Sequence, residues 1–491
     1  MLEIEEKTVQ ADGFEGLRKS LPFLLIFFLT LLSVRMYGHY LFDDSYFGFS
    51  YAKNLAEGHG FVFNPGQRYL GTSAPFVVPL YAFFYKFFGV DIVVTAQVLS
   101  FLLLIGGALS LFFLFRKNGE IPAFLAGLAF ATTPLVTLVI SHESLLYLGF
   151  GLLSVWALSR KKHLLAGVLV GIAMLCRMEA VVLFFPSLVL LLFQKEKKGL
   201  LLYGLSAFLI LLPWLVFATR YFGSPLSNTV QAKQLQVMYG NAPFWKGALL
   251  WLNAVYPGVP EKIGLVALVL TSIAAIKRLD SWAALLVSWA FLQCLIYLAL
   301  NVAYYHWFLC QLSILLAVGI QASFRLAREK KGFGKITMLS ILFLAMASLF
   351  TAQFKAIFSN RVRIEDHAYY RLAHWVKENT KPTDRVAYLE IGMLKFYSGR
   401  FIVDWLGLTT PGVLPYLKKR RLDLVIEQAK PEIFIQNDLF NNYLSIEGTP
   451  WFRVNYHLKA RVEGIGYPVP LKVYEFNRPG VSGRPGLPGP G

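Results

Sequence analysis

The chain has 491 residues, of which 56% are hydrophobic and 15% are charged, and its mean hydropathy is +0.53. Soluble globular proteins carry about 25% charged residues, so this composition excludes a disordered chain and an ordinary soluble enzyme. The three cysteines, Cys176, Cys294 and Cys310, lie in apolar stretches, which excludes a secreted disulfide scaffold. A lipid bilayer must therefore solvate much of the surface.

The net charge of +18 would suggest a nucleic-acid partner in a soluble protein. Here the basic residues gather in short loops between apolar runs, a pattern that the positive-inside rule explains. No polar region interleaves basic and aromatic residues, so we expect no nucleic-acid binding.

Apolar runs of helical length predict about eleven transmembrane helices in the chain. Several runs are shorter than about 17 residues, which indicates tilted helices or helices partly buried in protein. The runs lie at 21–41, 92–114, 121–140, 144–158, 163–177, 180–193, 199–219, 262–277, 282–302, 307–323 and 336–352.

The basic loops predict the orientation, because they fall on alternate sides of the eleven spans. The N-terminus is then cytoplasmic and the C-terminal region extracytoplasmic. The run 76–88 is followed by no basic loop, and we expect it to be an interfacial helix on the outer face. The basic loops are at 18–19, 116–117, 160–162, 195–198, 277–278 and 325–335.

The composition changes near residue 353, where helical and strand patterns begin to alternate in a more polar sequence. This predicts a soluble α/β domain at 353–478. We expect helices at 366–379 and 421–429, and strands at 385–391, 400–404, 432–436 and 470–476. The last residues, 479–491, predict a Gly/Pro-rich disordered tail.

The fold class is thus an α-helical polytopic membrane protein with a C-terminal extracytoplasmic α/β domain. The membrane module spans 1–352 and includes a large first outer loop at 42–91.

That first outer loop opens with Asp43 and Asp44, directly after an apolar span. Carboxylates at a membrane interface are costly to dehydrate, so an adjacent pair needs a reason. One of them could cap the helix that follows. The functional alternative is a general base that takes a proton from an attacking hydroxyl. A phosphate leaving group departs as a stable anion, so one carboxylate would suffice.

The stretch DDSYFGFSYAKNLAEGHGFVFNPGQRYLGTSAP at 43–75 resembles the first extracytoplasmic loop of the GT-C glycosyltransferases. It looks most like the branch related to mycobacterial arabinofuranosyltransferases and dolichyl-phosphate-mannose-type transferases. Weaker matches follow at 141–143, 177–179, 220–233 and 399–408. The resemblance departs from the family at Ala74 and at Ser227.

The resemblance implies an inverting transfer of a sugar from a polyprenyl-phosphate carrier to a lipid, glycan or protein hydroxyl. It also implies a prokaryotic inner membrane, with the chemistry on its outer face. The first-loop Asp is the base in this family; by position Asp43 is the first choice, and Asp44 orients the acceptor or shares the role.

An anionic lipid-linked phosphate requires cations at the interface. The candidates for binding donor phosphate or substrate are Glu143, Arg177, Glu179, Arg220, Lys233 and His306. Each also has a structural interpretation: Arg177 could pair with Glu179, Arg220 and Lys233 could snorkel to the interface, and His306 could belong to an aromatic belt. Glu143 could cap the next helix.

Within the enzyme interpretation, a hydrolase of lipid-linked sugars, with water in place of the acceptor, is an alternative. Two other classes of function also compete with sugar transfer. A transporter or flippase of lipid-linked saccharides predicts charges in mid-span and duplicated broken helices, which the sequence does not show. A non-catalytic scaffold gives no reason for Asp43 and Asp44. We expect no cofactor and no metal, since no His/Asp set has clear ligand spacing. Asp404 in the outer domain is predicted to be structural or to face the acceptor, and His59 to be a loop residue.

Overall fold

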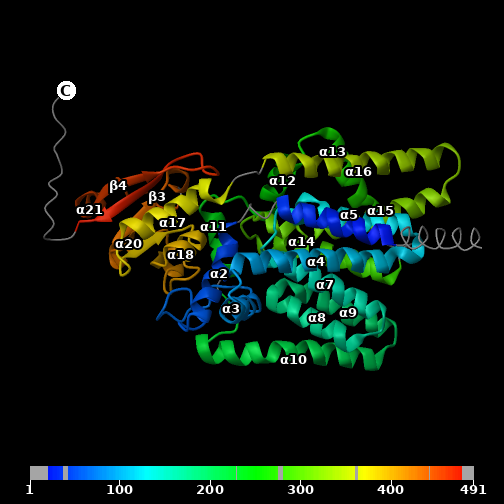
Figure 1. The fold of residues 1–491 in the computed structure, drawn as a ribbon, viewed down its shortest axis with the longest axis horizontal. Coiled ribbons are helices and arrows are strands. Elements are labelled where there is room, and N and C mark those ends of the chain that lie inside the picture. The colour runs from blue at the N-terminus through cyan, green and yellow to red at the C-terminus, as the bar shows by residue number, and fades with distance from the viewer. Residues whose placement is uncertain are drawn as a thin grey trace, which may run out of the picture.

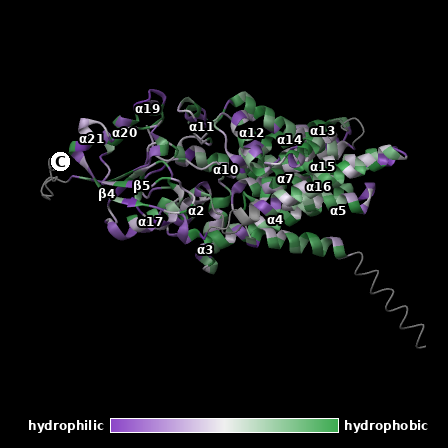
Figure 2. Ribbon diagram, turned by 90° about the horizontal axis from the view of Figure 1, so that it is seen from above, coloured by the Kyte–Doolittle hydropathy of each residue, from purple (hydrophilic) through white to green (hydrophobic). Residues whose placement is uncertain are grey.

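The computed structural model describes residues 20–36, 42–227, 229–274, 280–359, 363–441 and 443–477. A helix bundle occupies one end of the molecule and an α/β domain the other, with helices α2 (Asp43–Ala56) and α3 (Val77–Phe88) between them (Figure 1). Hydrophobic residues dominate the bundle and hydrophilic ones the domain (Figure 2). The predicted tail at 479–491 lies outside the described residues.

Apolar helices form the bundle, as the hydropathy predicts. Five of the described helices are long and apolar enough to cross a membrane, namely α4 with η1, α10, α14, η3 with α15, and α16. The exact number of eleven spans and their sidedness remain predictions. The bundle contains the helix Ser20–Met36, α4 (Ile92–Phe115), η1 (Arg116–Asn118), α5 (Glu120–Thr132), α6 (Pro134–Thr137), α7 (Glu143–Ser159), α8 (His163–Cys176), η2 (Met178–Ala180), α9 (Val181–Phe193), α10 (Lys197–Phe222), α13 (Val259–Ala274), α14 (Ser281–Leu300), η3 (His306–Leu309), α15 (Leu312–Glu329) and α16 (Phe333–Ser359).

One predicted span is broken. The apolar run 121–140 divides into α5 and α6, because Thr133 is extended and Pro134 begins the second helix. The residue before a proline is driven away from helical geometry, which explains the break. The short helices α11 (Thr229–Met238) and α12 (Phe244–Val255) follow α10 at the end of the bundle nearest the α/β domain (Figure 1).

The bundle packs as a chain of neighbours, in the order α10, α8, α7, α4, α5, α15, α13 and α16. Small residues allow close approach at several crossings, as in other membrane bundles. A Cβ atom on Gly167 of α8 would overlap the carbonyl of Tyr203 in α10, and one on Gly319 of α15 would overlap that of Leu268 in α13.

The α/β domain has a five-stranded sheet with the strand order β2-β1-β3-β5-β4. Strands β1, β2 and β3 are parallel, and β5 and β4 are antiparallel additions. The predicted strands and helices are present, but the helices α18, α19 and α21 and the strand β4 were not predicted. The elements are η4 (Ile364–Asp366), α17 (Ala368–Asn379), β1 (Arg385–Tyr388), α18 (Gly392–Ser398), β2 (Phe401–Asp404), α19 (Leu414–Lys418), α20 (Leu422–Ala429), β3 (Ile433–Gln436), η5 (Asp438–Phe440), α21 (Pro450–Asn455), β4 (Tyr456–Val462) and β5 (Leu471–Phe476).

The loop at 42–91 holds the α/β domain against the bundle. Helix α18 packs on α2. Asn64, in the predicted Asn-Pro-Gly turn, donates its amide to the Ile402 carbonyl at 2.8 Å and accepts the Ile402 N–H at 3.0 Å. The side chain thus pairs with the backbone of β2, the edge strand. A Cβ atom on Gly71 would overlap the carbonyl of Leu408, so glycine permits a second close approach there.

Candidate active site

A small polar cavity lies where the first loop, the bundle and the α/β domain meet. Its volume is about 50 Å³. Four of the eight residues predicted for the site line it: Asp44, Glu143, Arg177 and Lys233. The other lining residues are Phe47, Gly48, Gly71, Thr72, Ser73, Ala74, His142, Thr229, Trp307 and Leu408. Side chains from residue 44 to residue 408 therefore converge on one point.

Asp44 lies in the first turn of α2 and faces this cavity. Burial raises its pKa to about 6; the charge of Lys233 opposes that rise and the charge of Glu143 adds to it. Within the described part of the chain, no donor is hydrogen-bonded to its carboxylate. Asp44 is thus a carboxylate of raised basicity that is available to a ligand.

The neighbouring Asp43 points to the α/β domain instead. Its two oxygens accept the backbone N–H groups of Gly392 at 2.8 Å and Met393 at 2.7 Å, at the start of α18. Burial raises the pKa of Asp43 to about 7, although these two hydrogen bonds lower it. Both acceptor atoms of Asp43 are used in holding the domain. The geometry therefore favours Asp44 over Asp43, opposite to the order of preference taken from the sequence, and the identity of the base stays a prediction.

Lys233 on α11 provides a cation without a carboxylate partner among the described residues. Its Nζ atom lies over the rings of Tyr305, Trp307 and Phe308, at 4.5, 5.2 and 5.0 Å from their centres. Burial, together with the charge of the nearby Arg177, lowers the pKa of Lys233 to about 8. The aromatic faces hold the ammonium group in place and leave it able to meet an anion.

Arg177 is buried between two acids. It donates to Glu179 at 2.6 Å and to Glu143 at 3.3 Å, and Tyr297 donates its hydroxyl to Glu179 at 3.2 Å. The structural interpretation of the Arg177–Glu179 pair is therefore observed. Glu179 stands behind Arg177 and does not line the cavity, whereas Glu143 does.

Ser141 gives the segment before α7 an unusual backbone. Its φ of 71° is left-handed, and its N–H donates to the Ser100 hydroxyl at 2.9 Å. Such strain in a residue other than glycine is often found at functional sites. The turn brings His142 against Trp307, with ring centres 4.7 Å apart, and places Glu143 at the cavity. His142 and Trp307 were not singled out from the sequence; the serine conformation that signals them is visible only in three dimensions.

Two predicted residues lie elsewhere. Arg220 lines a separate groove on α10 and is absent from the polar cavity. His306 packs its ring 4.2 Å from that of Phe42 and also faces Trp251, and its Nε2 atom is buried without a partner among the described residues. The aromatic-belt interpretation suits His306 better than a role in phosphate binding. His59 is half exposed, as expected of a loop residue.

Asp404 has the structural role that was one of its two predicted roles. It ends β2, is fully buried, and accepts the N–H groups of Leu406 at 2.9 Å and Thr409 at 2.7 Å. Burial raises the pKa of Asp404 to about 6. The turn that it holds carries Leu408 to the wall of the cavity.

Glu390 was not among the site residues predicted from the sequence. It follows β1, at the carboxyl edge of the parallel strands, and precedes α18. Burial raises its pKa well above the ordinary value, and the charges of Asp43 and Asp44 raise it further. Ligands commonly bind beyond the carboxyl ends of parallel strands, and that rule could have drawn attention to Glu390.

Within the described residues, no group of three or more His, Cys, Asp and Glu side chains is arranged to hold a metal ion. Catalysis without a metal remains a prediction.

Two solved structures share this arrangement of bundle, loop and domain. ArnT from Cupriavidus metallidurans, bound to undecaprenyl phosphate, superposes with a TM-score of 0.58 at 13% identity, over 97% of this chain and 100% of that one. The arabinofuranosyltransferase AftD from Mycobacteria gives a TM-score of 0.51 at 13% identity, over 92% of this chain and 40% of that one.

The chain shares its fold with these two structures.

Comparisons of the sequence alone add less. A family model described as Domain of unknown function (DUF8728) matches residues 357–476, which form the α/β domain. No curated protein matches the chain in sequence.

Proposed function

We propose that this chain is an inverting glycosyltransferase that moves a sugar from a polyprenyl-phosphate carrier to a hydroxyl group of a lipid, glycan or protein. The reaction takes place on the outer face of a prokaryotic inner membrane. The observation that carries the proposal is that Asp44, Lys233 and Glu143 converge on one polar cavity bordered by an apolar pocket.

The apolar pocket supports a lipid-linked donor. It has a volume of about 310 Å³ and shares Thr72 and Ser73 with the polar cavity. A further apolar pocket of about 480 Å³ shares Leu175 and Trp214 with the first and continues along α10. A phosphate in the polar cavity would thus have space for its prenyl chain between α8 and α10. The ArnT structure contains a carrier of this kind, undecaprenyl phosphate.

In the proposed reaction, the acceptor hydroxyl attacks the anomeric carbon while the bond from that carbon to the phosphate oxygen breaks. Asp44 takes the hydroxyl proton, because it is the cavity carboxylate with a raised pKa and no hydrogen-bonded donor among the described residues. Lys233 neutralises the departing phosphate. A single displacement of this kind inverts the anomeric configuration.

Arg177 and Glu143 contribute by positioning groups and not by proton transfer. Arg177 forms ion pairs with Glu143 and Glu179, whose negative charges offset its own, so Lys233 is the better phosphate ligand. Glu143 would accept hydroxyl groups of the sugar. The cavity of about 50 Å³ holds only a few water molecules, and sugar binding therefore requires the first loop or the α/β domain to move.

The test uses the full chain, purified and reconstituted in lipid. A panel of polyprenyl-phosphate sugars is offered with candidate lipid, glycan and peptide acceptors, and the release of free polyprenyl phosphate is measured. We expect free polyprenyl phosphate to be released from one class of donor, and only when an acceptor is present. Translocation of an intact donor, as in the transporter alternative, releases no free carrier.

Asp44→Asn and Asp43→Asn form a matched pair of neighbouring, isosteric changes. Asp44→Asn should reduce turnover by about 10²- to 10⁴-fold, the usual effect of losing a general base. Asp43→Asn should stay within about tenfold of the wild type, because an amide oxygen still accepts one of the two N–H groups of α18. Full activity in Asp44→Asn, with loss in Asp43→Asn, would contradict the assignment of the base.

A further inference from the structure

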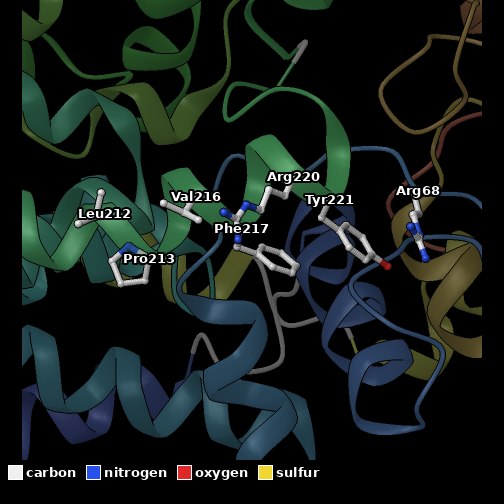
Figure 3. A pocket seen from close by; sticks show the side chains of 7 residues that line it. All are labelled: Arg68, Leu212, Pro213, Val216, Phe217, Arg220 and Tyr221. Carbon is white, nitrogen blue, oxygen red and sulfur yellow. The ribbon is translucent and has the colours of Figure 1, made fainter.

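A second lipid-sized groove lies on α10, apart from the polar cavity. It has a volume of about 550 Å³, within the range of about 300–1,000 Å³ typical of ligand sites. Six side chains of α10 and Arg68 of the first outer loop line it (Figure 3). Its floor is apolar and includes Pro213, Val216 and Phe217, and its polar end is formed by Arg220 and Arg68.

The two arginines carry uncompensated charge. Among the described residues, neither guanidinium has an ion pair or a hydrogen bond to a carboxylate. Tyr221 lies between them in Figure 3. The Arg68 guanidinium stacks on the Tyr221 ring at 4.8 Å, and that ring in turn stacks on Phe217 at 5.0 Å. Guanidinium groups bind phosphate oxygens through paired N–H donors, so this end of the groove suits an anionic phosphate.

The apolar end of the groove faces the surroundings of the bundle. Val216 and Phe217 are 42% and 39% exposed, on a helix that is long and apolar enough to cross a membrane. Arg220 lies in the last turn of this helix, where an interfacial head group would lie. A free phosphate ion would leave this apolar wall uncovered, whereas an acyl chain would bury it.

The polar end of the groove is separate from the polar cavity. The groove shares no lining residue with the cavity that contains Asp44 and Lys233. Its apolar end adjoins the pocket of about 480 Å³ proposed for the prenyl chain, because Pro213, Phe217 and Tyr221 line both. A phosphate held by Arg68 and Arg220 is therefore not placed for transfer, which favours a lipid that does not react over the sugar donor.

We propose that this groove binds one acidic glycerophospholipid of the surrounding leaflet. The phosphate lies at the polar end of the groove, which Arg220 and Arg68 form, and an acyl chain lies along Pro213 and Phe217. The bound lipid fastens the loop that follows α2 to the end of α10. The site does not depend on sugar transfer.

The test is native mass spectrometry of the purified full chain in detergent, titrated with phosphatidylglycerol or phosphatidylcholine. We expect one phosphatidylglycerol to bind in preference to phosphatidylcholine. The double variant Arg68→Gln/Arg220→Gln should bind it about 30-fold more weakly, or roughly fivefold for each guanidinium. Val216→Trp, which fills the apolar end, should weaken both lipids.

Lys246→Gln is the matched control, because Lys246 is an exposed cation on another apolar helix, α12. It should bind phosphatidylglycerol like the wild type, as should Asp44→Asn. Thermal unfolding in detergent verifies that each variant is folded. Equal binding of the two lipids by the wild type, or unchanged binding by the double variant, would overturn the proposal. If Arg68→Gln/Arg220→Gln also weakened the binding of polyprenyl phosphate about 30-fold, the groove would be a carrier site and the proposal would be overturned too.

Discussion

The dependence of turnover on pH is the most direct consequence of the cavity's electrostatics. Burial raises the pKa of Asp44 to about 6 and lowers that of Lys233 to about 8. The proposed reaction needs the first group ionised and the second protonated. We therefore expect a bell-shaped profile of kcat/KM with its maximum near pH 7.

The size of each limb follows from these values. At pH 5 about one Asp44 in eleven is ionised, and at pH 9 about one Lys233 in eleven is protonated, so kcat/KM should fall roughly tenfold at each end. The donor is a phosphodiester and keeps one charge throughout this range, so it does not produce the acid limb. The assay is the initial release of polyprenyl phosphate at low donor concentration, from pH 5 to pH 9.

Lys233→Arg separates the two limbs. Arginine stays protonated in proteins, so this variant should keep the acid limb and lose the alkaline one. Lys246→Arg, the same change at an exposed position on α12, should keep both limbs. A rate that is constant from pH 5 to pH 7 would refute Asp44 as the base. An alkaline limb that persists in Lys233→Arg would refute the phosphate role of Lys233.

Three further predictions concern the domain junction, buried charge and the carrier pocket. Gly392→Ala should destabilise the protein by about 1–3 kcal/mol, because its Cβ would overlap the backbone of the first residue of α2. Gly448→Ala, where that atom meets open space, should leave the midpoint of thermal unfolding unchanged; equal shifts in the two variants would contradict the close approach. Burial raises the pKa of Glu390, so the folded protein holds this proton more tightly than the unfolded chain does, and the resulting stability is full in acid and lost as the pH rises. Glu390→Gln should therefore flatten the fall in unfolding temperature between pH 5 and pH 9, and an unchanged slope would contradict the burial of this charge. Leu175→Trp should raise KM for long-chain donors by about tenfold with little effect on short-chain ones, since the indole fills the apolar pocket. Leu164→Trp, on an exposed part of the same helix, should not change KM; an equal rise for long and short donors in Leu175→Trp would place the chain elsewhere.

The different orientations of Asp43 and Asp44 could not be predicted from the local sequence. Adjacent residues in the first turn of a helix point in directions about 100° apart, so one can face the bundle while the other faces the α/β domain. Asp44 lies near Lys233, and Asp43 lies against the backbone at Gly392. Nothing near residue 43 in the sequence indicates which acid faces which group.

The broken run at 121–140 is a milder case. Its hydropathy is continuous, but Pro134 ends one helix and begins another. The proline was visible in the sequence, and the rule for the residue before a proline could have predicted the division. By contrast, Arg220 and Lys233 are thirteen positions apart in one predicted motif but line two different pockets. Their separation depends on the turn at Gly223 and on the packing of α11.

The sequence by itself determined the properties that follow from local chemistry. Apolar runs of helical length must be solvated by lipid or by one another, and the alternating pattern after 353 must form a small sheet. Only the tertiary structure decided which polar groups meet. Asp44, Glu143, Lys233 and Leu408 are separated by up to several hundred residues, and their convergence depends on helix packing and on the docking of the α/β domain through Asn64 and Asp43. Burial at that junction sets the pKa of each acid, and burial is a property of the assembled fold.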